Sequence, residues 1–285
     1  MRYSGRDFSD TEIAEIRRII EEDSSRTRWA LSRLICEAFG WRKLDGALKE
    51  MSCRVAMLRM EQDGYVRLPP PRRRNGNGTH CVRRTPQAEP QPPICTAASA
   101  LPDLRLQPVA SKGDSRLWNE YIDRYHYLGY KPLPGAQMRY FAWADGRVLA
   151  LLGFGAAAWK TAPRDEFIGW TREQRESRLH LVVNNARYLI LPWVTSKHLA
   201  SKLLGQAARQ LPGDWQARYG YRPVLLETFV EKRRFSGTCY RAANWLCLGN
   251  TQGRGKLDRH RSHALPIKSV WVYALNTRFR RLLAE

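Results

Sequence analysis

A segment rich in proline and arginine interrupts the chain between residues 69 and 108. Nine of the 16 prolines fall in this segment, and residues 69–93 read PPPRRRNGNGTHCVRRTPQAEPQPP. Proline has no backbone donor, and so polar a stretch buries too little apolar surface to offset the entropy of ordering the chain. We therefore expect two domains, residues 1–68 and 109–285, joined by a basic linker over residues 69–108.

The first domain has the pattern of three helices followed by a short strand. Apolar residues recur at helical spacing over residues 9–22, 27–39 and 46–62, and the segment YVRLPPP after Gly64 has the composition of a strand. This order is typical of a winged helix-turn-helix, whose third helix enters the major groove of DNA. A winged helix that docks on another protein is the alternative.

The third of these helices decides what the first domain would bind. Its expected buried stripe consists of four apolar residues: Leu48, Met51, Val55 and Leu58. Lys49 and Met57 then lie on the opposite face, with Arg54 on the flank. Lys49 and Arg54 are the residues that we predict to contact DNA.

The second domain alternates between strand and helix patterns. Asp145 and Gly146 separate two apolar runs, RYFAWA and RVLALLGFGAAAW, which is the signature of a β-hairpin. The elements expected after it are a strand at 187–193, a helix at 195–211, a strand at 223–231, a helix at 238–248 and a strand at 269–275. We therefore predict an α+β fold in which helices flank a mixed sheet.

The charge of the chain constrains its partners. Its 48 Lys and Arg residues against 27 Asp and Glu residues give a net charge of +21. A folded chain this basic favours DNA as a partner, although an arginine-rich proteome would produce the same excess. No apolar run is long enough to span a membrane, and the N-terminus has no secretory signal pattern. We expect a cytoplasmic protein with no membrane partner.

Basic residues beyond the first domain are candidate phosphate contacts. Arginines and backbone N–H groups on glycine-broken loops suit the phosphates of DNA, and TQGRGKLDRHRSH is such a loop. The candidates are Arg72, Arg73, Arg74, Arg187, Arg241, Arg254, Lys256 and Arg259. A solvated spacer is the alternative interpretation of the linker arginines.

Two carboxylates, Asp165 and Glu227, are candidate catalytic residues and ligands of a Mg²⁺ ion. Glu227 and Glu231 share one face of a strand but lie about 13 Å apart along it, too far to bind one ion together. Glu227 therefore needs a partner from elsewhere, and Asp165 in PRDEFIGW is the expected one. In the alternative, Glu227 satisfies buried donors and Glu231 neutralises Arg233 or Arg234.

Tyr240 is a second catalytic candidate. A phenolate leaves more readily than an alkoxide, so a tyrosine suits a transient phosphotyrosine link to DNA. His126 would then act as the base, with Arg241 or Arg187 on the phosphate. The alternative is a core tyrosine whose hydroxyl donates to the backbone.

The order of elements in the second domain resembles the GNAT acyltransferase fold, as does the segment YRAANW. Tyr240 stands five residues before Trp245, as in the Tyr-x-x-x-Gly-Phe helix end of that fold, with Asn244 in the place of the glycine. The resemblance implies a general-acid role for this tyrosine. However, acetyl-CoA needs bare backbone N–H groups at a helix N-terminus, and PWVTSKHLASKL has no glycine before Gly205. We therefore expect that acetyl-CoA does not bind.

Four blocks, YHYLGY, VVNNARYLILPWV, LLETFVEKRRFSGTCYRAANW and TQGRG, resemble the DruA family of the Druantia anti-phage defence system. Relatives of that family are also labelled as transposases of mobile elements. The resemblance implies a role on DNA, with defence-system or mobile-element proteins as partners. Our preferred function is strand cleavage or transfer, and the alternatives are a non-catalytic DNA-binding scaffold and an acyltransferase.

Overall fold

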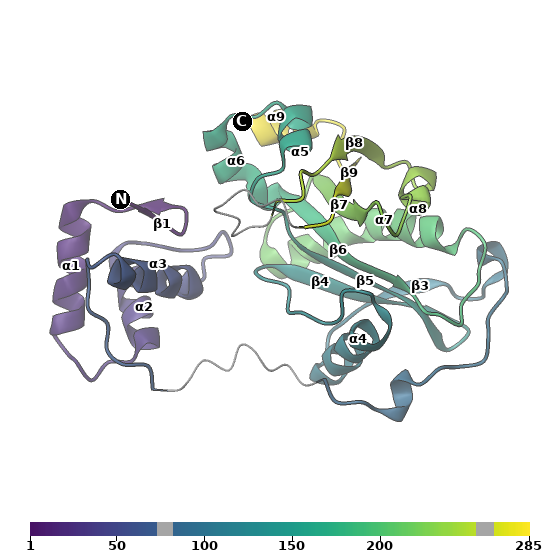
Figure 1. Ribbon diagram of the computed structural model, residues 1–285, viewed down its shortest axis with the longest axis horizontal. Coiled ribbons are helices and arrows are strands. Elements are labelled where there is room, and N and C mark those ends of the chain that lie inside the picture. Colours follow the sequence, from purple (N-terminus) through teal and green to yellow (C-terminus); the bar gives the residue numbers. More distant parts are fainter. Residues whose placement is uncertain (73–81, 255–264) are drawn as a thin grey trace. The chain divides into compact units, whose positions relative to one another are not determined.

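The chain folds into two compact units, Met1–Thr79 and His80–Glu285 (Figure 1). The structure is a computed structural model that describes residues 1–72, 82–254 and 265–285. Among these residues, no helix is both long enough and apolar enough to cross a membrane.

The first unit consists of three helices and an N-terminal hairpin. Its elements are β1 (Arg2–Tyr3), β2 (Arg6–Asp7), α1 (Asp10–Glu21), α2 (Arg28–Ala38) and α3 (Glu50–Gln62). Ser9 caps α1, because its side chain accepts from the Glu12 N–H while the Glu12 carboxylate accepts from the Ser9 N–H. The helices enclose a core that includes Ile16, Leu31, Ile35 and Met60. The three predicted helices are confirmed.

The buried face of α3 differs from the predicted one. The residues that α3 buries are Cys53, Ala56, Met57 and Met60. Met51 and Leu58, which were expected in the core, are 63% and 39% exposed. Apolar residues occupy both sides of this helix, so spacing alone does not choose between them, and contact with α2 and β1 decides. The segment after Gly64, predicted as a strand, is irregular.

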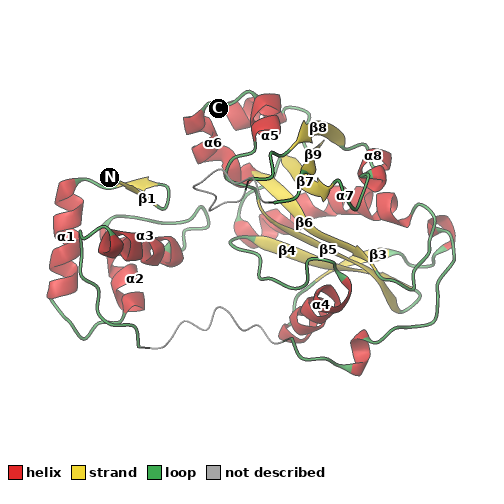
Figure 2. Ribbon diagram, viewed as in Figure 1, coloured by secondary structure: helices red, strands yellow, loops and turns green. Residues whose placement is uncertain are grey.

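A seven-stranded mixed sheet forms the centre of the second unit (Figure 2). Its strands are β3 (Arg105–Pro108), β4 (Gln137–Ala144), β5 (Arg147–Ala156), β6 (Val182–Ile190), β7 (Leu225–Glu231), β8 (Leu246–Asn250) and β9 (Lys268–Ala274). They lie in the order β3-β4-β5-β6-β7-β9-β8, and β6 and β7 are the parallel neighbours. This pair is in register only over Val182–Asn184 and Leu225–Glu227, after which the two strands part.

Helices cover both faces of this sheet. They are α4 (Lys112–Tyr125), α5 (Ala162–Ile168), α6 (Arg172–Arg178), α7 (Leu199–Tyr219), α8 (Thr238–Ala242) and α9 (Phe279–Ala284), with short 3-10 turns at Pro86–Ala88, Ala98–Ala100 and Leu179–Leu181. Trp118 of α4 lies against Gly153, whose partner in the sheet is Arg187. The next residue, Tyr188, points to the opposite face, where its hydroxyl donates to the Ala200 carbonyl of α7. Accordingly, α4 and α7 lie on opposite sides of the sheet (Figure 1).

Residues 85–108 pack onto the second unit. The N–H and hydroxyl of Thr85 donate to the Glu120 carboxylate of α4, at 2.6 and 2.7 Å. Ile94 forms a parallel bridge with Val194, and Arg105–Pro108 is the edge strand β3. This differs from the linker predicted over residues 69–108, because the polar backbone groups of a proline-rich segment find partners on a folded neighbour that the sequence alone does not reveal.

The predicted β-hairpin is confirmed, and one predicted helix is too long. β4 and β5 meet at Asp145 and Gly146, whose φ angles of 50° and 67° suit the tight turn of such a hairpin. The helix expected over residues 238–248 ends at Ala242, and β8 follows. Asn244, with a φ of 61°, turns the chain between them.

Candidate functional site

Glu227 lies on β7 with both carboxylate oxygens bound by the protein itself. Oε1 accepts from the Ala158 N–H at 2.7 Å, and Oε2 accepts from Arg164 Nη1 at 2.8 Å. Glu227 and Arg164 are fully buried. Burial raises the pKa of Glu227, and the Arg164 charge opposes that rise. The carboxylate thereby ties the loop after β5 to the centre of the sheet.

Asp165 binds the same arginine. Its Oδ1 accepts from Arg164 Nε and Nη2 at 2.9 and 2.7 Å, and from the Trp170 indole N–H at 3.1 Å. The two carboxylates predicted to share a Mg²⁺ ion thus share a guanidinium, which already supplies the positive charge, so the residues present do not fit a metal. Among the described residues, no group of three or more His, Cys, Asp and Glu is arranged to hold a metal ion.

Tyr240 lies on the opposite face of the sheet from Glu227. Its hydroxyl donates to Asn185 Oδ1 at 2.7 Å and lies 3.5 Å from Thr228 Oγ1. Thr228 directly follows Glu227 on β7, and successive strand residues point to opposite faces. Burial raises the pKa of the Tyr240 phenol. The structure therefore does not bring Glu227 and Tyr240 together.

A different group of side chains meets on the α4 face of the sheet. It comprises His126, Tyr127, Arg187, Arg234 and Phe235, which we call the Arg187 cluster. The His126 and Tyr127 rings stack with centroids 4.8 Å apart, and Tyr127 meets Phe235 at 5.5 Å. The Arg234 guanidinium lies 5.0 Å from the Tyr127 ring centroid, a cation–π contact. His126 and Arg187 were predicted as site residues; the others were missed, although the run KRRF offered a signal by placing an aromatic beside three basic residues.

Arg187 is partly buried and has no acidic partner within the part of the chain that the structure describes. Its Nη1 donates to the adjacent Ala186 carbonyl at 2.8 Å, whereas its buried Nε has no hydrogen-bond partner among the described residues. Burial lowers the pKa of this guanidinium. Burial and the Arg187 charge also lower the pKa of His126 from 6.5 to about 4, so the imidazole is neutral at physiological pH.

A bulge in β6 sets the position of Arg187. Phe154 pairs with Asn185 and Gly153 pairs with Arg187, so Ala186 is an extra residue in the strand. Gly153 leaves room for the side chains of Arg187 and Trp118. A Cβ at Gly153 would lie 3.2 Å from the Arg187 Cβ and 3.0 Å from Trp118 Cζ2.

The turn after β7 holds the exposed part of the Arg187 cluster. The Glu231 carbonyl accepts from the N–H groups of Arg234 and Phe235 at 3.1 and 2.9 Å, and the Glu231 carboxylate lies 3.3 Å from Arg234 Nε. Gly237 has a φ of 75°, and a Cβ there would lie 2.6 Å from the Trp271 ring, so glycine is required. The turn leaves Phe235 51% exposed.

The remaining predicted DNA contacts of the second unit do not belong to this cluster. The Arg241 guanidinium lies 6.0 Å from the centroid of the Trp271 ring, and Arg254 is exposed. Two candidates, Lys256 and Arg259, lie outside the described residues.

The predicted contacts of the first unit fall on α3 and on the segment after it. Lys49 is the residue before the first turn of α3, and Arg54 is partly buried within that helix. Arg72 donates to the Ser25 carbonyl at 3.1 Å. Arg73 and Arg74 lie outside the described residues.

The chain covers its own loop between β6 and α7, where the GNAT resemblance places the pyrophosphate of acetyl-CoA. The Ile94 N–H donates to the Trp193 carbonyl at 2.9 Å, and the Thr195 N–H donates to the Ile94 carbonyl at 2.8 Å. The Ala98 N–H donates to the Lys197 carbonyl at 3.1 Å. The Thr195 N–H, in the loop where a phosphate would need donors, is therefore already bonded within the chain.

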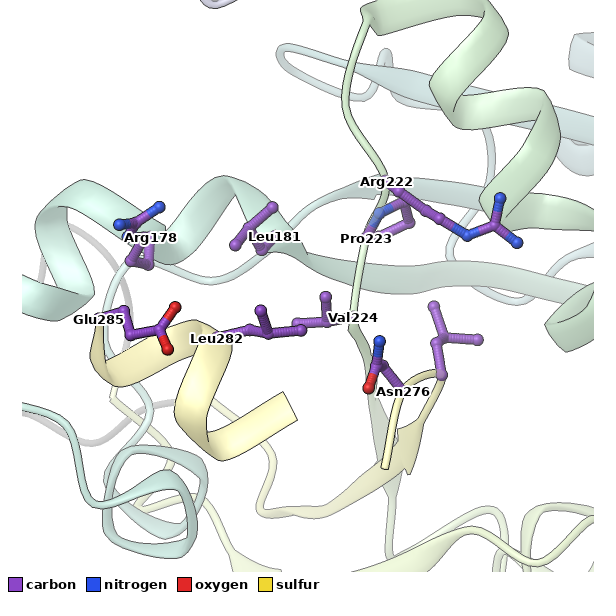
Figure 3. Close-up of a pocket in the computed structure, with 9 residues that line it drawn as sticks. Arg178, Leu181, Arg222, Pro223, Val224, Asn276, Leu282 and Glu285 are labelled. Carbon is purple, nitrogen blue, oxygen red and sulfur yellow. The ribbon is translucent and has the colours of Figure 1, made fainter. Parts of the chain in front are cut away.

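A cavity of about 290 Å³ lies near the start of β7 (Figure 3). The turn that carries Arg234 and Phe235 follows the other end of that strand. Its aliphatic walls come from Leu181, Val224, Leu275 and Leu282. Its rim carries charges of both signs, including Arg178 and Glu285. None of the predicted site residues lines it.

Comparison with known proteins identifies the family. The sequence model of the family described as Druantia protein DruA matches residues 59–281. The chain belongs to the DruA family. The DruA match includes every residue of the Arg187 cluster, and membership indicates a role in Druantia defence. None of the curated proteins matches the chain.

Several solved structures similar to this DruA chain are acetyltransferases. A GNAT-family acetyltransferase from Streptococcus pneumoniae is 12% identical with a TM-score of 0.39, and the match covers 61% of this chain and 100% of that one. The aminoglycoside acetyltransferase AAC(6')-Ib in complex with coenzyme A is 16% identical with a TM-score of 0.42, covering 63% of this chain and 98% of that one. At these values the similarity concerns the fold alone.

Proposed function

We propose that the protein binds DNA as a component of Druantia defence and that the Arg187 cluster holds a DNA phosphate. The observation that carries this proposal is the partly buried Arg187 guanidinium, whose Nε lacks a partner among the described residues. A buried charge without a counter-charge is costly, and an anion that reaches it gains strong, charge-assisted hydrogen bonds. The net charge of +21 makes a polyanion the natural source of that anion.

The neighbours of Arg187 support an anion as the ligand. His126 is neutral beside the arginine because its pKa is about 4, so it offers an N–H donor without adding a second positive charge. The Glu231 carboxylate is paired with Arg234 at 3.3 Å. Arg187 therefore keeps its charge available for an incoming phosphate.

A non-catalytic role has more support than strand cleavage at Glu227 and Tyr240. Both oxygens of Glu227 are bound, and the residue is fully buried behind Arg164. The Tyr240 hydroxyl is bound to Asn185 on the other face of the sheet. A general acid, base or nucleophile must reach its substrate. We therefore favour a DNA-binding scaffold and hold cleavage as the alternative.

Fluorescence anisotropy with labelled oligonucleotides over a series of salt concentrations tests this proposal. We expect a steep loss of affinity with salt, and Arg187→Met should weaken binding about tenfold or more and reduce the slope of log K against log salt by about 1. Arg105→Met is the matched control, because Arg105 is an exposed arginine of β3 paired with Asp103. A flat salt dependence of the wild type, or equal effects of the two variants, would refute the proposal.

For the first unit we propose that α3 contacts DNA through Lys49 and Arg54, as the third helix of a winged helix-turn-helix does. One observation favours a partner protein as a second candidate. Exposed apolar side chains gather on α2 and α3, where Trp29, Met51 and Leu58 are 50%, 63% and 39% exposed.

Two pairs of substitutions separate these candidates for the first unit. Lys49→Gln with Arg54→Gln should weaken DNA binding if α3 enters a groove. Met51→Gln with Leu58→Gln should instead leave DNA affinity intact and abolish phage protection in cells if the helix docks on a protein. The pair of substitutions that has no effect identifies the candidate to discard.

A further inference from the structure

We propose that the Arg187 cluster takes an unpaired nucleotide, whose base stacks on Phe235 while its phosphate lies on Arg187. The site would then prefer single-stranded DNA to duplex. This inference rests on the proposed DNA-binding function and adds the strandedness of the ligand.

Two aromatic side chains of the Arg187 cluster are exposed to solvent. Phe235 is 51% exposed and Tyr127 is 38% exposed, and their ring centroids lie 5.5 Å apart. The base pairs of a duplex are stacked on each other, so their faces are closed to a protein side chain. An unpaired base presents both faces, and stacking on aromatic rings is how single-strand binders hold it.

Basic residues surround these rings. Lys232, Arg233 and Arg234 precede Phe235 in the same turn, and all three are exposed. Arg187 is close enough to Tyr127 for its charge to affect the pKa of the phenol, as Arg234 also does. A single strand carries both bases and phosphates, and this surface places aromatic rings beside guanidinium groups. Complementary charge thus favours a nucleic acid strand over an apolar partner.

Hydrogen bonds and an ion pair hold the turn that carries Phe235 in place. The Glu231 carbonyl binds the N–H groups of Arg234 and Phe235, and the Glu231 carboxylate holds the Arg234 side chain. Gly237 closes the turn against Trp271. The aromatic surface is therefore formed before the ligand arrives, which reduces the entropy lost on binding.

The test compares a 20-nucleotide single strand with the 20-base-pair duplex of the same sequence, using the full chain and fluorescence anisotropy. Because α3 is proposed to bind duplex DNA, the readout for the Arg187 cluster is the effect of a substitution on each of the two ligands. Phe235→Leu keeps an apolar side chain but removes the ring, and it should weaken single-strand binding at least about fivefold while leaving duplex binding unchanged. Trp159→Leu is the matched control, because Trp159 is an aromatic of similar exposure, 53%, outside the cluster.

A second readout uses 2-aminopurine in the single strand, whose fluorescence falls when the base stacks. Wild-type protein and Trp159→Leu should quench the probe, and Phe235→Leu should not. If Phe235→Leu matches wild type on both the single strand and the duplex, this inference is overturned and the DNA-binding proposal is left standing. If neither oligonucleotide binds, the DNA-binding proposal itself fails. If Phe235→Leu abolishes phage protection with DNA binding unchanged, the surface binds a protein and the inference is wrong.

Discussion

Replacing Glu227 by glutamine separates a structural carboxylate from a catalytic one. The substitution keeps the size of the side chain but removes its charge and turns one acceptor oxygen into a donor NH₂ group. In the wild type the Ala158 nitrogen and Arg164 Nη1 lie 2.7 and 2.8 Å from the carboxylate oxygens. The new NH₂ group must face one of these two donors. One buried donor loses its acceptor, and among the described residues Asp165 is then the remaining counter-charge of the buried guanidinium.

The size of the effect follows from the burial of this pair. Glu227 and Arg164 are both 0% exposed, so solvent does not compensate for the lost partner. Breaking a buried ion pair by removing one member costs about 3–5 kcal/mol. In a unit of this size each kcal/mol lowers the melting temperature by roughly 2–4 °C, so we expect a fall of at least about 6 °C.

Thermal unfolding followed by tryptophan fluorescence is the assay. Trp170 reports on this region, because its indole binds Asp165 and its ring lies 5.5 Å from the Arg164 guanidinium. The double variant Arg164→Met with Glu227→Leu is the control. Removing both charges together should restore part of the stability that either single change loses. Phage protection should fall only as far as the folded population falls.

One result would refute this reasoning. If Glu227→Gln has the same melting temperature as the wild type but abolishes phage protection, the carboxylate is not a structural anchor. A loss of about 100-fold at full stability is the scale expected for an acid–base group, and it would restore Glu227 as a catalytic residue.

Three further predictions concern Tyr240, His126 and acetyl-CoA. Tyr240→Phe removes the hydrogen bond to Asn185 and should lower stability by about 1 kcal/mol in urea unfolding, with phage protection retained; full stability with lost protection would contradict this. The pKa of His126 is about 4 in the folded chain against 6.5, so its contribution to stability is complete above about pH 6.5 and is lost as the pH falls towards 4. His126→Asn should therefore lose less stability than wild type over that range, and identical pH profiles would count against it. Micromolar acetyl-CoA should leave the melting temperature unchanged, because the chain covers the loop between β6 and α7; a clear rise would show that the loop opens to the cofactor.

Much of the architecture could be predicted because its signals are local. The hairpin follows from Asp145 and Gly146 between two apolar runs, since these residue types tolerate the positive φ angles of a tight turn. The boundary between α8 and β8 was missed because Asn244, rather than a glycine or proline, turns the chain there. The buried face of α3 was also missed, since both of its sides carry apolar residues.

The candidate site was predictable only in part. His126 and Arg187 were identified from charge and chemistry, and the structure brings them to one cluster. Tyr127 and Phe235 lie far apart in the sequence, so their ring contact depends on how the segment after α4 and the turn after β7 meet on one face of the sheet. For Glu227 two interpretations were open, a Mg²⁺ ligand and an acceptor for buried donors, and the structure agrees with the second. The sequence could not name the donors, because Arg164 lies 63 residues away along the chain.

The sequence by itself determined the types of most elements, the basic character of the chain and the family to which it belongs. These properties depend on periodicity, composition and contiguous motifs, all of which are visible along the chain. Only the tertiary structure decided which charges are neutralised and which remain available. Arg164 and Glu227 are 63 residues apart and meet because the loop after β5 folds over β7. Among the described residues the Arg187 charge is not neutralised, because the same folding brings this side chain beside His126 and Tyr127 and not beside a carboxylate.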